Sequence, residues 1–135
     1  MEKFCNKQYK QISRDEFYDE YLKGLGYNYL IRKIATNLFI TSKLSKINDE
    51  EFKIETSTLL SSQALTFKIG KEIENFTIEG RKVKSTFTID DNKLIEKQIE
   101  GDKKVTIVRK FHDSELIIDL SVNGITTRLK NILIK

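Results

Sequence analysis

From Phe39 onward this chain is dominated by short runs in which apolar and polar residues alternate. In a β-strand, alternate side chains point to opposite faces, so such a run can bury one face and expose the other to water. Leu65, Phe67 and Ile69 alternate in this way with polar residues. Turn residues interrupt the runs about every ten positions from Phe39 onward, which is typical of an antiparallel β-sandwich or β-barrel.

The boundaries between the expected strands are marked by turn residues. Runs over residues 83–89, 94–99, 105–111 and 116–122 are separated by turns at 90–92, 100–102 and 112–114. Asn123-Gly124 is the favoured two-residue hairpin signal before a last strand. With an N-terminal strand near residues 7–12, the pattern predicts about ten strands.

Two short helices are expected between the first strand and the others. Residues 13–16 have the Ser-x-x-Glu form of a capping box, which predicts a helix that ends at Gly26 and places Phe17, Tyr21 and Leu25 on one face. Apolar stripes at four-residue spacing predict a second helix within residues 27–38. The pair has the shape of a helix-turn-helix, but its turn and spacing do not suit a DNA-recognition helix.

Length and composition predict one domain with a thin wall. The 135 residues are enough for a single domain over 1–135, while 39% hydrophobic and 33% charged residues leave little for a solid core. Cys5 is the only cysteine, so no internal disulfide is possible. Without a leader-like start or an apolar stretch of about 18 residues, a soluble cytoplasmic protein is expected.

The charge pattern leaves a basic interaction or nucleic-acid-binding module as the alternative to a ligand-carrying barrel. The net charge is +4, and the densest basic cluster lies at residues 81–84. On the strand period Lys82 and Lys84 fall opposite Val83 and Phe87, which is the pattern of a solvated outer face. We therefore expect no nucleic-acid partner.

Catalytic and metal-binding patterns are missing from the sequence. The single histidine, His112, lies in an expected turn, and Cys5 lies among the first residues. No Cys/His cluster has zinc spacing, and isolated turn glycines form no phosphate-binding loop. The sequence predicts a binding protein without metal or cofactor, and not an enzyme.

Arg109 is the residue that most directly indicates a function. The strand period places it with Val105, Ile107 and Phe111 on an apolar face. A guanidinium keeps its proton, and burying it without a partner costs several kcal/mol. Its partner is either an internal Asp or Glu, water near a strand end, or the carboxylate of a ligand.

Several stretches of this chain resemble the intracellular lipid-binding proteins, specifically the fatty-acid-binding protein family. They are residues 65–72, 81–86, 107–110 and 124–128, and the resemblance runs over nearly the whole chain. It implies an all-β fold, a ten-stranded antiparallel up-and-down β-barrel of two near-orthogonal sheets. A short helix-turn-helix lid over about residues 14–37 would cap its mouth.

The same resemblance implies how a ligand would be bound. Interior arginines and a tyrosine bind the fatty-acid carboxylate in that family, and Arg109 falls on one of the arginine positions. The family's final Arg-x-Tyr is replaced by Arg128-Leu129-Lys130, so we expect Arg128 and Lys130 to complete the carboxylate site. The count from Gly124 is one residue short, and a slip of one residue reverses a side chain's facing. Either Arg128 faces the cavity, as we expect, or Leu129 does.

These observations predict a monomeric intracellular carrier that binds one long-chain fatty acid, or a similar anionic lipid, reversibly in an internal cavity. A carrier of another hydrophobic ligand such as a retinoid is the alternative within the family, and Arg109 favours an acid over an alcohol. The expected cavity-lining residues are Phe17, Tyr21, Ile54, Leu60, Phe67, Phe87, Ile107 and Ile118. Lys23, Arg32 and Lys33 on the lid would either contact an anionic membrane or serve as ordinary solubilising charges.

Overall fold

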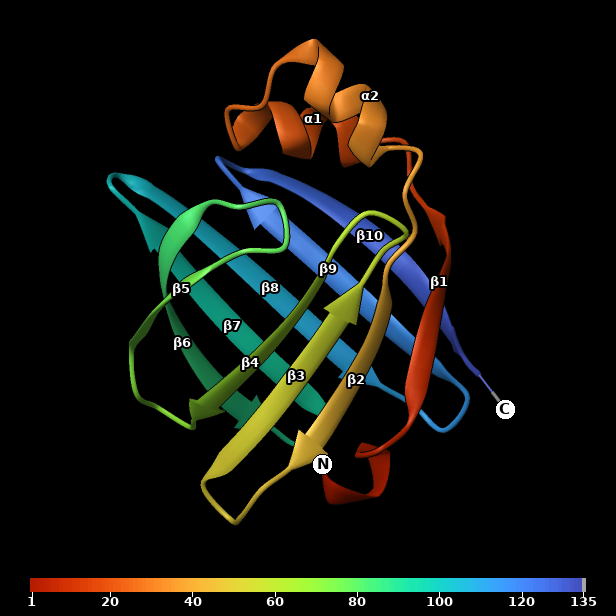
Figure 1. The fold of residues 1–135 in the computed structure, drawn as a ribbon, viewed down its shortest axis with the longest axis vertical. Coiled ribbons are helices and arrows are strands. Elements are labelled where there is room, and N and C mark those ends of the chain that lie inside the picture. Colours follow the sequence, from red (N-terminus) through yellow and green to blue (C-terminus); the bar gives the residue numbers. More distant parts are fainter. Residues whose placement is uncertain (135) are drawn as a thin grey trace.

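The computed structural model describes residues 1–134, which form ten β-strands, two α-helices and one short 3-10 helix (Figure 1). The 3-10 helix η1 spans Glu2–Phe4. The strands are β1 (Gln8–Arg14), β2 (Thr41–Lys46), β3 (Glu51–Ser57), β4 (Ser62–Lys68), β5 (Ile73–Phe76), β6 (Lys82–Asp90), β7 (Lys93–Glu100), β8 (Lys103–Phe111), β9 (Glu115–Val122) and β10 (Ile125–Leu133). The helices are α1 (Tyr18–Gly24) and α2 (Tyr29–Ala35).

The strands pair in chain order and form a nearly closed barrel. Their order in the sheet is β4-β3-β2-β1-β10-β9-β8-β7-β6-β5, and the paired neighbours are antiparallel. Strands β4 and β5 stand at the two ends of this order, and the Gln63 side chain donates a hydrogen bond to the Phe76 carbonyl between them. The predicted all-β, up-and-down barrel with a helical cap is confirmed.

The Asn123-Gly124 turn joins β9 to β10, as its sequence predicts. Both residues have positive φ, 51° and 78°, and Ile125 pairs directly with Val122. A two-residue loop of this kind matches the twist of the flanking strands. It therefore determines the register of the whole last strand.

The first helix begins later than the capping-box pattern indicates. Ser13 lies in β1 instead of capping a helix, because that strand continues to pair with β10 through Arg14. The Asp15 carboxylate accepts hydrogen bonds from the backbone N–H of Phe17 at 3.0 Å and of Arg128 at 2.9 Å. Pairing with a distant strand thus overrides the local helix signal, and the helices occupy 18–24 and 29–35 within the predicted lid.

Aromatic and aliphatic side chains fill part of the barrel. The Phe4 ring of η1 stacks on Phe111 with centroids 5.8 Å apart, and η1 lies at the opposite end of the barrel from the helices (Figure 1). Phe67 stacks on Phe87 at 3.8 Å and on Phe52 at 6.2 Å. Neither helix within residues 1–134 has the length and apolar content that a membrane span requires.

Candidate ligand-binding site

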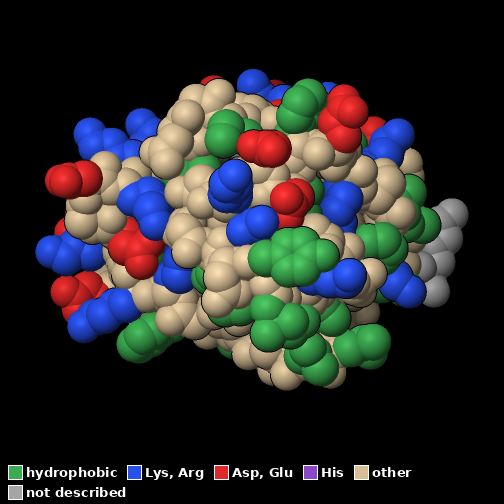
Figure 2. All heavy atoms as spheres, turned by 90° about the horizontal axis from the view of Figure 1, so that it is seen from above, with side chains coloured by type: hydrophobic (Ala, Val, Ile, Leu, Met, Phe, Trp, Pro, Cys, Tyr) green, Lys and Arg blue, Asp and Glu red, His purple; other side chains and the backbone are tan. Residues whose placement is uncertain are grey.

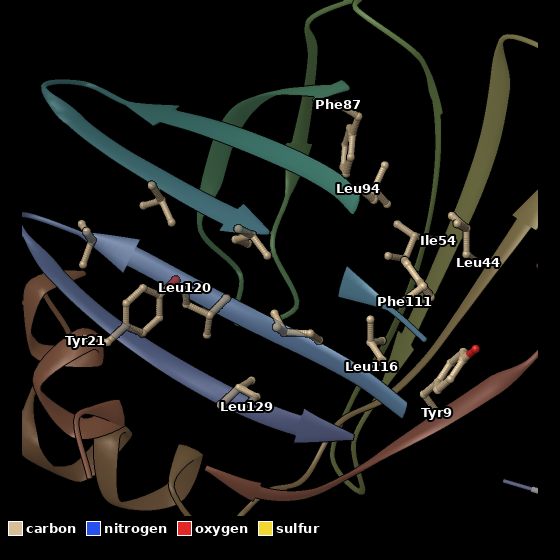
Figure 3. Packing of buried hydrophobic residues seen from close by; sticks show 14 of the residues in the cluster. Tyr9, Tyr21, Leu44, Ile54, Phe87, Leu94, Phe111, Leu116, Leu120 and Leu129 are labelled. Carbon is tan, nitrogen blue, oxygen red and sulfur yellow. The ribbon is translucent and has the colours of Figure 1, made fainter. Parts of the chain in front are cut away.

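A cavity lies inside the barrel, and all ten strands and α1 contribute to its lining. Five of the expected lining residues border it, namely Tyr21, Ile54, Phe87, Ile107 and Ile118. Tyr21 from α1 points into the same interior as Leu120 of β9 and Leu129 of β10 (Figure 3). The helix thus covers a mostly apolar space within the barrel.

Three of the expected lining residues lie elsewhere. Phe17 precedes α1 as its N-cap residue and is exposed, because the helix starts later than expected. Leu60 is exposed in the loop between β3 and β4 and borders a second pocket, beside α2. Phe67 is buried in its aromatic stack and does not border the cavity.

Arg109 points into the barrel, as the strand period predicts, and it meets an internal acid there. Its Nη1 lies 3.0 Å from Oε1 of Glu96, and the two side chains are only 11% and 5% exposed. Glu96 also accepts hydrogen bonds from Ser85 Oγ at 3.1 Å and Gln98 Nε2 at 2.8 Å. Because Arg109 and Glu96 both border the cavity, the ion pair forms part of the site itself.

Hydrogen bonds continue from this ion pair to the lid. Gln98 Oε1 accepts from Arg81 Nη2 at 3.2 Å, and Arg81 Nη1 lies 3.2 Å from Glu100 Oε1. Arg81 Nε donates to the Tyr27 hydroxyl at 3.1 Å. Burial raises the pKa of Tyr27 to about 12, so this hydroxyl is neutral near pH 7. A row of polar side chains therefore runs along the cavity from Arg109 to Arg81, and Arg81 connects it to the segment between the helices.

The expected roles of Arg128 and Lys130 in the cavity were wrong. The hairpin register pairs Arg128 with Asp119 and Leu129 with Ile118, so Leu129 faces inward and the two cations face outward. Arg128 is 57% exposed and binds Asp119 through Nε at 2.8 Å and Nη2 at 3.1 Å. The shorter count from the turn thus reverses the side chains of the last strand, which is the alternative that the sequence left open.

Among the three lid cations, Arg32 has a structural contact. Its Nε lies 3.0 Å from Asp19 of α1, and its Nη1 donates to the Tyr27 carbonyl at 2.8 Å. It therefore holds α2 against α1 and is only partly exposed. Lys23 and Lys33 are exposed.

Glu96 was missed in the sequence, although a signal for it was present. Leu94, Glu96 and Gln98 alternate onto one face. The turn at Gly101 pairs Glu96 with Ile107, two residues along the strands from the pair that Leu94 forms with Arg109. Reading this turn as a tight hairpin would have placed the acid beside the arginine. Gln11 and Asn131, two buried amides of the cavity wall, carry no charge that could mark them.

An up-and-down barrel with a helical lid and a polar cluster inside a cavity whose surface is mostly apolar defines a class of carriers for small lipophilic ligands. The model of the Lipocalin / cytosolic fatty-acid binding protein family matches residues 7–127, and the chain belongs to this family. The family predicted from the sequence is therefore confirmed.

Individual relatives agree over nearly the full length. The chain is 37% identical over 123 residues to a fatty acid-binding protein of Tyrophagus putrescentiae, covering 90% of this chain and 92% of that one. It is 33% identical over 131 residues to a muscle fatty acid-binding protein of Schistocerca gregaria, covering 96% of each. The structure of a fatty acid-binding protein from brain tissue of Drosophila melanogaster superposes with a TM-score of 0.86 at 35% identity, covering 96% of this chain and 98% of that one.

Proposed function

We propose that this protein is a cytoplasmic carrier that binds one long-chain fatty acid reversibly, as a monomer and without catalysis. The observation that carries the proposal is a buried arginine at the wall of a largely apolar cavity, in a chain whose relatives are named fatty acid-binding proteins. Burial of the acyl chain supplies most of the affinity, at about 0.8 kcal/mol per methylene. The description of the family as cytosolic supports the compartment.

Arg109 is the proposed contact for the head group of the lipid. A guanidinium has five N–H donors, and Arg109 makes one side-chain hydrogen bond within residues 1–134, to Glu96. The remaining donors are available to an oxygen of the ligand. The outward-facing Arg128 has no access to the cavity and provides a matched comparison.

Displacement of a fluorescent fatty-acid probe by oleate tests this function. We expect displacement with one site per chain, weakened by Arg109→Gln through the loss of a charge-assisted hydrogen bond of about 1.5–3 kcal/mol. Arg128→Gln should leave the affinity unchanged. Failure of oleate to displace the probe, together with salt-sensitive binding to oligonucleotides, would instead favour a nucleic-acid-binding module.

We further propose that the lid contacts anionic membranes during transfer of the ligand. Lys23 and Lys33 are exposed, as are Tyr29 and Leu30 of α2. Figure 2 shows hydrophobic side chains gathered on this face of the molecule, with Lys and Arg side chains among them. A cation near an anionic leaflet contributes about 1 kcal/mol, and exposed apolar side chains can enter the interface.

Transfer of a fluorescent fatty acid to vesicles tests the membrane contact. The rate should rise with anionic lipid and with vesicle concentration, and Lys23→Glu with Lys33→Glu should slow it. Lys84→Glu with Lys97→Glu, two exposed cations of the barrel wall, is the matched control and should transfer at the original rate. A transfer rate that changes neither with vesicle charge nor with any of the four substitutions would mean that the fatty acid is released through water.

A further inference from the structure

The buried charges of the barrel cancel each other. Within residues 1–134 the charged residues that are buried are Glu96 and Arg109, whose side chains meet at 3.0 Å. Two further charged residues border the cavity: Arg81, which is paired with Glu100 at 3.2 Å, and Glu79, which is exposed. The cavity therefore presents an arginine whose charge is already neutralised by a neighbouring carboxylate.

An ionised ligand carboxylate would disturb this balance. Glu96 already accepts hydrogen bonds from Ser85, Gln98 and Arg109, so both of its carboxyl oxygens have donors. A second carboxylate at Arg109 would give the buried cluster a net negative charge. Two carboxyl groups that share a site in a low-dielectric interior do not both ionise readily, and the pair retains one proton.

The remaining polar groups of the cavity suit an uncharged head group. The inward residues of β10 are Thr127, Leu129 and Asn131, none of them charged. Gln11 Oε1 accepts from the Ile40 N–H at 3.1 Å, while its buried Nε2 has no partner within residues 1–134. Since an unpaired buried donor is costly, this amide would be satisfied by a ligand oxygen, and an uncharged carbonyl or hydroxyl oxygen is sufficient for it.

We propose that Glu96 makes the cavity select uncharged polar head groups, so that a fatty acid binds together with one proton. The inference rests on the proposed fatty-acid-binding function and adds the ionisation state of the ligand. The proton comes from solvent and is held between the carboxyl groups of the ligand and Glu96. Lipid alcohols and acylglycerols, which carry no charge, bind without proton uptake.

The other titratable groups at the cavity do not supply this proton. Burial raises the pKa of Tyr18 to about 12 and raises that of Tyr21 above its ordinary value, so both hydroxyls stay protonated between pH 6 and 8. Arg81 and Arg109 are guanidinium groups that stay charged. Glu79 is exposed at the edge of the cavity.

Binding of oleate and of oleyl alcohol, measured from pH 6 to 8, tests the inference. With one proton bound per oleate, its Kd should rise about tenfold per pH unit, whereas the Kd of the alcohol stays constant. Calorimetry in two buffers of different ionisation enthalpy should count about one proton per oleate. Glu96→Gln should abolish this uptake and tighten oleate binding at pH 8 by about tenfold or more.

Glu55→Gln is the matched control, since Glu55 pairs with Lys53 at 3.3 Å and does not border the main cavity. It should keep the pH dependence of the original protein. If Glu96→Gln does not fold, the proton count of the unmodified protein still decides. A Kd for oleate independent of pH, with no proton uptake, would overturn the inference and leave the fatty-acid function intact. If neither lipid displaces the probe at any pH, the proposed function fails as well.

Discussion

Removal of Arg109 should destabilise the protein, because it leaves Glu96 buried without its counterion. In Arg109→Gln the carboxylate keeps its hydrogen bonds from Ser85 and Gln98 but loses the contact at 3.0 Å with the guanidinium. Breaking a buried ion pair by removal of one partner costs about 3–5 kcal/mol. Since two of the three hydrogen bonds to Glu96 remain, we expect a loss near the lower end, about 3 kcal/mol.

Urea unfolding measures this loss directly. With a slope of about 2 kcal/mol per molar urea, the midpoint should fall by about 1.5 M. The double variant Arg109→Gln with Glu96→Gln removes both charges and should recover most of the stability. Arg128→Gln breaks an exposed ion pair and should cost less than about 1 kcal/mol, which makes it the matched control.

The reasoning would be refuted by an Arg109→Gln variant as stable as the original protein. It would also be refuted by a double variant that is less stable than Arg109→Gln alone. Either result would mean that Glu96 does not depend on Arg109 for its charge compensation.

Two further predictions concern the outer wall and the lid. The hydrogen bond from Arg128 lowers the pKa of Asp119 in the folded protein. The stability that the Asp119 carboxylate provides is therefore fully present above its unfolded pKa of about 3.9, and it is lost as the pH falls through its folded pKa. Asp119→Asn should lower the free energy of unfolding by less than about 1 kcal/mol at pH 7 and flatten the pH dependence of the urea midpoint below pH 4. A variant whose urea midpoint falls with pH as steeply as that of the original protein would contradict this. Gly24→Ala should lower stability by about 1–3 kcal/mol in thermal melts, because the added methyl would lie 2.9 Å from Val122 Cγ1 of β9. A stabilised Gly24→Ala variant, as helix propensity alone predicts, would show that α1 can shift on the barrel.

The sequence alone determined which side chains share one face of a strand, as the strand that carries Arg109 shows. Arg109 lies inside because Val105, Ile107 and Phe111 share its face, and this alternation is a local property of the extended backbone. The Asn123-Gly124 hairpin was equally local, since both residues adopt the positive φ that the turn requires. About ten strands followed from such local patterns, whereas the family followed from the resemblance of several stretches of the chain to it.

The tertiary structure decided where local signals competed and which residues became partners. The capping-box signal at Ser13 lost to the pairing of β1 with β10, a strand more than one hundred residues away in the chain. Arg128 faces outward because the turn pairs it with Asp119 and pairs Leu129 with Ile118. A shift of one residue in this register would reverse the facing of every side chain in the strand.

The partner of Arg109 shows the same division most clearly. Its inward direction follows from its own strand, but the identity of the partner depends on which strand lies beside it and in what register. The pairing of β7 with β8 brings Glu96 within 3.0 Å of the guanidinium, and so makes the buried site an ion pair instead of a lone cation. Which residues share a face with Arg109 depends on its own strand alone. Which side chain contacts it depends on two strands and their register, and these come together only in the folded barrel.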